Sequence, residues 1–329
     1  MDNKINTTTS YAVETYALYK NVDNSILKLN EIIKKYGYTF LAVNLPDLEK
    51  NFSSLVSLPT NFQSEKTLIL DEDKSSVSGE FYDLLTNHHS FGHESAFKRE
   101  VVFLKRIENF EQEVVNKTVS LGLSMNVSDE LRSFSSSLIQ QLRLYKNGDI
   151  VCPLEFQIAA DTRKITSKSW RHSKVFGHLE FLITNEDVIA LTKALSDKFT
   201  STPLTELAIN SYNLSYEIAD LKTKYITLMT CLESLMNLGA HQITHTVSRH
   251  LALIISRSAE EFQTNYLRTK KLYEIRSSIV HGGKINEDLT KATNELHDKV
   301  RKAINYCLNL HLDKEGLFAK LNASGYGLT

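Results

Sequence analysis

The sequence predicts an α+β protein, with a mixed α/β N-terminal domain followed by an all-α, four-helix-type bundle. Three observations indicate this. Short β-rich runs broken by turn residues occupy residues 1–198. Beyond the polar segment 196–203, apolar residues repeat every three or four positions, which is the period of one helical face. The length of 329 residues suits two domains of roughly 100–200 residues each, which we place at 1–198 and 199–329.

The N-terminal domain is expected to contain several short strands and one helix. The β-rich runs predict strands at 38–43, 66–70, 101–104, 154–158 and 176–183. A hairpin is expected from 142–145 to 150–152, because Asn147-Gly148 suits a tight turn in which both residues take φ > 0. Residues 184–187 are typical of a helix start, and this helix is expected to continue to Leu195. We expect this domain to be a sensor or regulatory domain.

The C-terminal domain is expected to contain four helices. The first carries an apolar stripe with spacings of four, three, four and three, made by Leu221, Tyr225, Leu228, Leu232 and Leu235. It ends near Gly239, and a second helix covers 247–255. A third runs from about Glu260 to Val280 and stops at Gly282-Gly283, where glycine tolerates a left-handed cap. The fourth covers 289–312.

Composition narrows the class of protein. The net charge of −1 means that the whole chain does not attract nucleic acid, so contact with RNA must come from a local basic patch. Cys152, Cys231 and Cys307 are odd in number and far apart, which fits reduced, buried thiols. The N-terminus has no apolar signal core, and no apolar run approaches the roughly 20 residues of a membrane span. We therefore expect a cytoplasmic protein without membrane contact.

The segment 272–283, Leu-Tyr-Glu-Ile-Arg-Ser-Ser-Ile-Val-His-Gly-Gly, carries the main functional pattern. It places Arg276 five residues before His281, near the end of a helix. Arginine stays charged and binds phosphate oxygens with a planar fork. Histidine exchanges protons near neutral pH. A fixed cation beside a titratable imidazole is the minimum set of groups for RNA cleavage without a metal.

This segment resembles the Arg-x4-His motif of the HEPN superfamily, in the Apea-like branch. The resemblance covers roughly 205–312 and is also carried by the helices at 225–235 and 247–255. It implies a helical bundle that forms a homodimer, with two motifs lining one cleft. It also implies a toxin or anti-phage effector that cuts RNA (tRNA or mRNA) by 2′-hydroxyl attack, leaving a cyclic phosphate and a free 5′-hydroxyl.

The resemblance assigns roles to individual residues. His281 is the expected general acid or base, and Arg276 the expected phosphate ligand. The alternative is that Arg276 caps or pairs on the bundle surface and that His281 is a helix-end residue favoured by the helix dipole. Glu233 is expected to orient one of them through a charge-assisted hydrogen bond, or else to be an ordinary edge glutamate. Ser277 stands where active relatives often have Asn, Asp or His, and its hydroxyl can still donate. Tyr273 is either a core residue or a platform on which a base stacks.

A local basic excess supports contact with RNA. Residues 240–284 contain seven Lys or Arg and three Glu, a pattern that suits a phosphate backbone or an ordinary solvated face. The expected RNA-binding residues are Arg249, Arg268, Lys270, Lys271 and Lys284.

No metal and no cofactor are expected. Two histidine groups lack a full ligand set at recognisable spacing: His241 with His245, and His88, His89 and His93 with Glu94. Two alternatives to a nuclease remain. One is a non-catalytic HEPN module that binds RNA or a nucleotide and dimerises, and the other is a toxin–antitoxin partner acting through protein contact.

Overall fold

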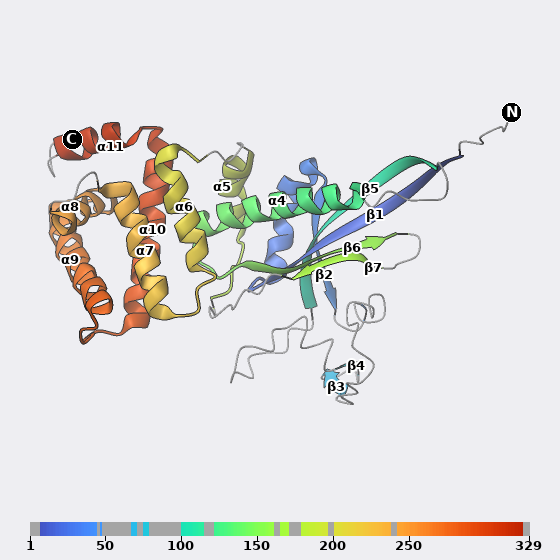
Figure 1. Ribbon diagram of the computed structural model, residues 1–329, viewed down its shortest axis with the longest axis horizontal. Helices are drawn as coiled ribbons and strands as arrows, with labels where there is room; N and C mark the ends of the chain where they lie inside the picture. Colours follow the sequence, from blue (N-terminus) through green and yellow to red (C-terminus); the bar gives the residue numbers. More distant parts are fainter. Residues whose placement is uncertain are drawn as a thin grey trace. The chain divides into compact units, whose positions relative to one another are not determined.

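The structure is a computed structural model that describes residues 7–44, 47, 67–70, 75–78, 100–114, 122–160, 165–170, 179–196, 201–237 and 242–324. The chain forms two compact units. Unit 1 comprises 1–142 and 148–197, and unit 2 comprises 143–147 and 198–329. The α+β class is confirmed, with the sheets in unit 1 and a helical bundle in unit 2 (Figure 1).

Unit 1 contains a five-stranded antiparallel sheet with strand order β2-β5-β1-β6-β7. Its strands are β1 (Thr7–Lys20), β2 (Tyr38–Asn44), β5 (Glu100–Val114), β6 (Val151–Ala159) and β7 (Ile165–Trp170). The central pair β1 and β5 runs in register from Thr7↔Val114 to Tyr19↔Val102. A separate pair, β3 (Thr67–Leu70) and β4 (Ser75–Ser78), forms a two-stranded sheet.

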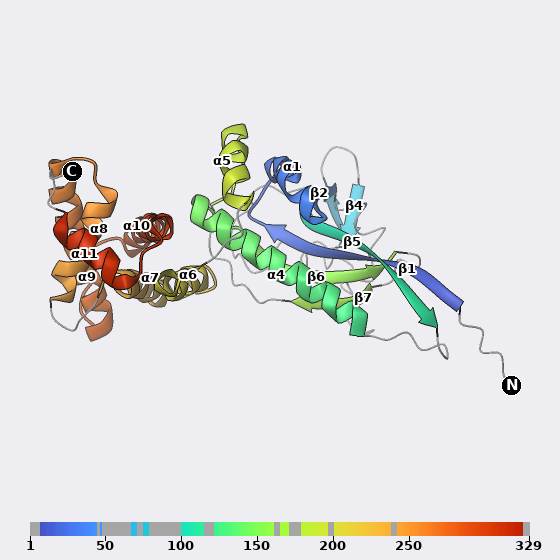
Figure 2. The same ribbon diagram turned by 90° about the horizontal axis from the view of Figure 1, so that it is seen from above.

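Helix α4 (Gly122–Tyr145) lies along one face of this sheet (Figure 2). The Tyr19 hydroxyl and Ser135 Oγ are 2.8 Å apart, and the Tyr38 and Phe134 rings stack with centroids separated by 3.8 Å. Because side chains alternate along a strand, the neighbouring positions point to the other face, where Tyr16 stacks on Phe156. The core of unit 1 therefore has an aromatic layer on each side of β1.

A group of short helices in unit 1 packs together beside β2. They are η1 (Asn24–Leu29), α1 (Asn30–Ile33), η2 (Lys34–Tyr36) and α5 (Asn185–Ser196). Asn30 ties this group to β2, since its Oδ1 accepts from Phe40 N at 2.6 Å and its Nδ2 donates to Phe40 O at 2.9 Å. The Tyr36 hydroxyl donates to Leu195 O at 2.9 Å and so holds α5 in place.

Unit 2 is a helical bundle whose members are α6 (Pro203–Ser215), α7 (Leu221–Met236), α8 (Ile243–Ile255), α9 (Ala259–His281), α10 (Leu289–Leu310) and α11 (Lys314–Ala323). Side-chain oxygens satisfy free amides at the start of five of these helices, from Thr202, Asp220, Ser258, Asp288 and Asp313. Helix α7 packs against α6, α8, α9 and α10 and is the central helix of the bundle.

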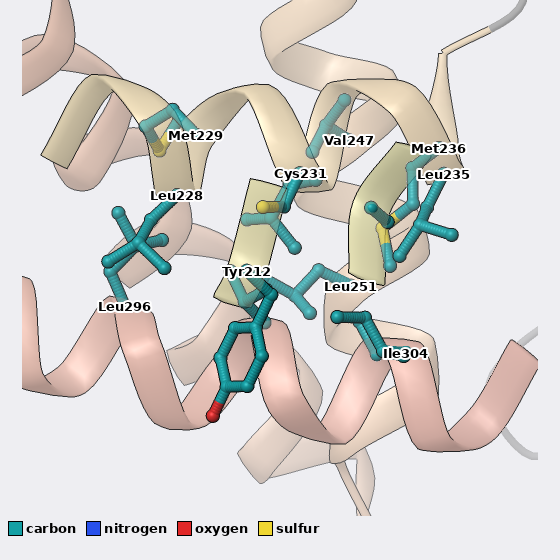
Figure 3. Packing of buried hydrophobic residues seen from close by; sticks show 14 of the residues in the cluster. Tyr212, Leu228, Met229, Cys231, Leu235, Met236, Val247, Leu251, Leu296 and Ile304 are labelled. Atoms are coloured by element: carbon teal, nitrogen blue, oxygen red, sulfur yellow. The ribbon is translucent and has the colours of Figure 1, made fainter. Parts of the chain in front are cut away.

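The apolar stripe expected in the first helix of the bundle forms the core of unit 2. Leu228, Leu232 and Leu235 of α7 are all fully buried. Figure 3 shows Leu228 and Leu296 pointing toward each other between α7 and α10. The buried Tyr225 hydroxyl donates to Leu272 O at 2.8 Å, which ties α7 to α9.

The expected hairpin at Asn147-Gly148 is wrong. Residues 142–145 form the last turn of α4, and β6 begins only at Val151. Among the described glycines, only Gly37 and Gly282 have positive φ, so the tight turn is not formed. Gly148 is needed for close packing instead, because a Cβ there would lie 2.6 Å from Phe181 Cδ2. An alternating run of four residues was too short to distinguish a strand from a helix end.

Other differences follow from weak local patterns. The strand expected at 176–183 is wrong for residues 179–183, where Phe181 makes only an isolated bridge with Val22, and 176–178 lie outside the described residues. Nine elements of the described residues were not expected: β1, β4, β7, η1, α1, η2, α4, α6 and α11. The strands expected within β2, β3, β5 and β6, helix α5 and the four C-terminal helices are confirmed. The division between Asp197 and Lys198 adjoins the expected boundary, but 143–147 belong to unit 2.

Candidate functional site

An ion pair joins α7 to α9 at the candidate site. Arg276 Nε lies 3.2 Å from Glu233 Oε1, and Arg276 Nη2 lies 3.4 Å from Glu233 Oε2. Both side chains are partly accessible, with 35% of Arg276 and 22% of Glu233 exposed. The carboxylate therefore holds the guanidinium in a fixed orientation beside solvent. Glu233 was expected to contact Arg276 or His281, or to be an ordinary edge glutamate, and in the structure it contacts Arg276.

Tyr273 lies one helical turn before Arg276 on α9 and is buried. Burial raises the pKa of its hydroxyl, and the charge of Glu233 raises that pKa further. The hydroxyl thus interacts with the carboxylate that also pairs with Arg276. The ring therefore belongs to the bundle core and offers no free face on which a base could stack.

His281 is the last residue of α9 and is exposed, as is Ser277. Gly282 ends the helix with φ 70°, and its amide donates to Ser278 O. Five residues of ideal helix turn His281 about 140° away from Arg276. His281 instead shares the exposed face of α9 with Glu274 and Lys270, which precede it by two and three turns (about 3.6 residues each). One copy of the chain therefore does not bring His281 and Arg276 to the same side.

Two of the expected RNA-binding arginines bind the protein itself. Arg268 donates to Glu287 and, through Nε, to Glu295 at 2.8 Å. These carboxylates raise the pKa of the Arg268 guanidinium. Arg249 donates from Nη1 to Leu321 O and from Nη2 to Ser324 O, both at 2.9 Å. Both arginines thus use their N–H donors in contacts that stabilise the fold, with the end of α11 and with the segment that follows α9.

The expected lysines remain at the surface, since Lys270, Lys271 and Lys284 are all exposed. Lys270 Nζ lies 5.7 Å from the centre of the Tyr266 ring. The positive excess counted over 240–284 is smaller in space than in sequence, because Glu233, Glu287 and Glu295 lie outside that window and pair with arginines inside it.

A second polar cluster in unit 2 was not expected. The Arg143 guanidinium lies 4.0 Å from the centre of the Tyr216 ring, and the Tyr212 hydroxyl lies 3.4 Å from His297 Nδ1. Burial lowers the pKa of His297 to about 3, and the positive charges of nearby lysine and arginine side chains act in the same direction. No sequence pattern indicated this cluster, because Arg143 comes from a segment that was expected to be a strand.

The described residues contain no group of three or more metal-ligating side chains. His245 Nδ1 lies 2.9 Å from the Tyr266 hydroxyl. His241 and the group of His88, His89, His93 and Glu94 lie outside the described residues. The three cysteines are free and buried, as expected. Within the described ranges, we find no helix with the length and apolar character of a membrane span.

No protein-family model matches this chain, and searches of curated proteins and of solved structures also found no match. The residues and their geometry are therefore the basis for assigning a function.

Proposed function

We propose that unit 2 is a HEPN-like module and that the protein is a metal-independent endoribonuclease acting in anti-phage defence or as a toxin. The observation that supports this best is the Glu233–Arg276 ion pair, which presents a fixed guanidinium beside solvent about 1.4 helical turns before the exposed His281. A guanidinium held in place before substrate arrives stabilises the charge of a transition state without reorganisation.

The reaction needs only these side chains and the RNA. Arg276 binds the non-bridging oxygens of the scissile phosphate. The His281 imidazole takes the proton of the 2′-hydroxyl, and the 2′-oxygen forms a bond with phosphorus. The bond from phosphorus to the 5′-oxygen then breaks, and that oxygen takes the proton from the imidazolium. The products are a 2′,3′-cyclic phosphate and a free 5′-hydroxyl.

The site is completed by a second copy of the chain. Because Arg276 and His281 diverge by about 140° around α9, one copy cannot present both to the same phosphate on ideal geometry. A two-fold axis beside α9 places Arg276 of one protomer opposite the partner subunit's His281. The same axis generates two equivalent composite sites per homodimer. Lys270 and Lys271, both exposed on α9, then flank the path of the RNA.

Cleavage by the purified protein in EDTA tests this proposal. Total RNA and tRNA are incubated with wild type and with Arg276→Ala, and the ends of the products are determined. We expect cyclic-phosphate and 5′-hydroxyl ends from wild type, and a loss of about 10²–10³ in rate for the variant, the usual effect of removing one electrostatic contact in the transition state. RNA that is bound but left intact would instead identify a non-catalytic binding module.

A further inference from the structure

The segment between α9 and α10 begins beside His281. Gly282 and Gly283 close α9, and both of their amides donate to Ser278 O, the second at 2.7 Å. A left-handed glycine with this pair of bonds is a Schellman cap, which satisfies a carbonyl that has no donor within the helix. Helix ends fray, so the cap depends on the chain that follows it staying in place. The position of His281 therefore depends on what holds residues 284–288.

Arg268 holds this segment near its far end. Its Nη1 donates to Glu287 Oε2 at 2.9 Å and its Nη2 donates to Glu287 Oε1, so the guanidinium contacts both oxygens of the carboxylate. Its Nε donates to Glu295 Oε2 of α10 at 2.8 Å. Two parallel bonds fix orientation as well as distance, and a lysine cannot form them. One arginine thus joins the body of α9 to the segment and to α10.

The surroundings distinguish this contact from an isolated surface ion pair, which would contribute little. The Arg268 side chain is only 25% exposed. Glu295 also lies 3.6 Å from Nζ of the buried Lys299, so the charges form a network. Between the cap and Glu287, Ile285 packs against the bundle core. The segment is therefore attached at its start, in its middle and near its end.

We propose that Arg268 and Glu287 are positioning residues for His281, an inference that rests on the proposed function. By fixing the segment 282–288, the pair keeps the last turn of α9 formed and the imidazole in its catalytic position. Arg268 was expected to bind RNA, but its Nε, Nη1 and Nη2 all donate to carboxylates of the protein. A displacement of about 1 Å at a reacting group can cost on the order of 10² in rate, so a contact outside the site can control cleavage.

Glu287→Gln separates positioning from charge. The variant loses the ion pair and one negative charge, so electrostatics alone predicts RNA binding at least as tight as in wild type. Loss of position predicts slower cleavage. The single-turnover rate on tRNA is measured in EDTA with full-length protein at saturating concentration, because an unfolded fraction does not change that rate. We expect cleavage to be about 10–10² times slower than in wild type.

Binding is measured separately from cleavage. A fluorescent 2′-O-methyl RNA oligonucleotide lacks the attacking hydroxyl, and its Kd is determined by anisotropy. We expect the Kd of Glu287→Gln to equal or fall below that of wild type, so that the loss lies in the chemical step. Tighter binding with an unchanged cleavage rate would instead mean that Glu287 competes with RNA for Arg268.

Two further variants show whether the effect passes through the pair. Arg268→Lys keeps the positive charge and loses the two parallel bonds, so it should also slow cleavage. Adding Glu287→Gln to Arg268→Lys should slow cleavage no further, because the two residues act through one contact. Glu260→Gln removes an exposed carboxylate from the first turn of α9 and should cleave like wild type.

Hydrogen exchange of the amides of 279–288 tests the attachment of the segment independently of cleavage. We expect faster exchange there in Glu287→Gln and Arg268→Lys, and the wild-type rate in Glu260→Gln. Unchanged exchange in the first two variants would overturn the proposal, as would cleavage by Glu287→Gln at the wild-type rate, and in both cases the nuclease proposal would stand. If wild type does not cut RNA, the proposed function fails and the positioning role fails with it, even where exchange shows that the pair holds the segment.

Discussion

Glu233 and Arg276 show how the chemistry of a single residue is decided by partners on other helices. Three arginines of the bundle are alike in sequence but differ in their partners. Arg249 donates to backbone carbonyls, Arg268 pairs with two carboxylates near the start of α10, and Arg276 pairs with Glu233 of α7. The contact of Glu233 with Arg276 could be anticipated, because a carboxylate beside an apolar stripe needs a partner. The fold roles of Arg249 and Arg268 could not, since their acceptors come from α11, α10 and the segment after α9.

The buried His297 makes stability depend on pH. The pKa of His297 is lowered from 6.5 to about 3 in the folded protein, so between these values the unfolded chain binds a proton that the folded chain does not. The stability contributed by the neutral imidazole is complete above pH 6.5 and is lost as pH falls toward 3. We expect the free energy of unfolding to fall by roughly 2–3 kcal/mol between pH 6.5 and 4.

Urea unfolding at a series of pH values measures this effect, with His297→Gln as the comparison. The variant should lose most of the slope in this range, whereas His311→Asn, which changes an exposed histidine, should keep it. Identical slopes for wild type and His297→Gln would show that His297 titrates normally in the folded protein.

Of the elements of unit 2, α6 and α11 were not expected, whereas α7, α8, α9 and α10 were predictable from their apolar residues at helical spacing and from clear stops such as Gly282 after α9. Those of unit 1 were harder. Helix α4 contains the polar run Ser135-Ser136-Ser137, and β1 begins with Thr7-Thr8-Thr9, so neither shows a strong period at its start. Packing of α4 against the sheet decides these structures, and no local pattern reports that packing.

Gly148 provides a test of packing at this scale. A methyl group at Gly148 would lie 2.6 Å from Phe181 Cδ2, so we expect Gly148→Ala to destabilise unit 1 by about 1–3 kcal/mol, the usual cost of overpacking. Gly283→Ala is the matched control, because its nearest atoms lie 3.4 Å or more away at Ser278. Chemical denaturation followed by circular dichroism compares the two. Equal stability of both variants would mean that Phe181 moves aside at no cost.

At the scale of the whole molecule, the proposal depends on two copies of the chain. A homodimer of Arg276→Ala chains has both composite sites disabled, and so has a homodimer of His281→Ala chains. In a mixed dimer, one site regains Arg276 from one protomer and the partner subunit's His281. Random assortment therefore restores about one quarter of wild-type cleavage.

Mixing the two inactive variants and measuring cleavage against each alone tests this directly. Activity that stays at the level of the single variants, with exchange of protomers shown by differently tagged copies, would place Arg276 and His281 in one protomer instead.

The division into two units could be anticipated from the polar segment before Pro203, whereas the membership of 143–147 in unit 2 could not. Those residues join the bundle through contacts distant in sequence, such as Asn305 Nδ2 donating to Leu144 O at 2.7 Å.

The most direct test of the central claim is RNA cleavage in EDTA by wild type, His281→Asn and His311→Asn. His281 and His311 are both exposed histidines at a helix end, so the third protein controls for loss of a surface imidazole. We expect wild type and His311→Asn to cut RNA at the same rate and His281→Asn to be inactive. Cleavage by His281→Asn at the wild-type rate, or cleavage by wild type that stops in EDTA, would contradict a metal-independent nuclease centred on His281.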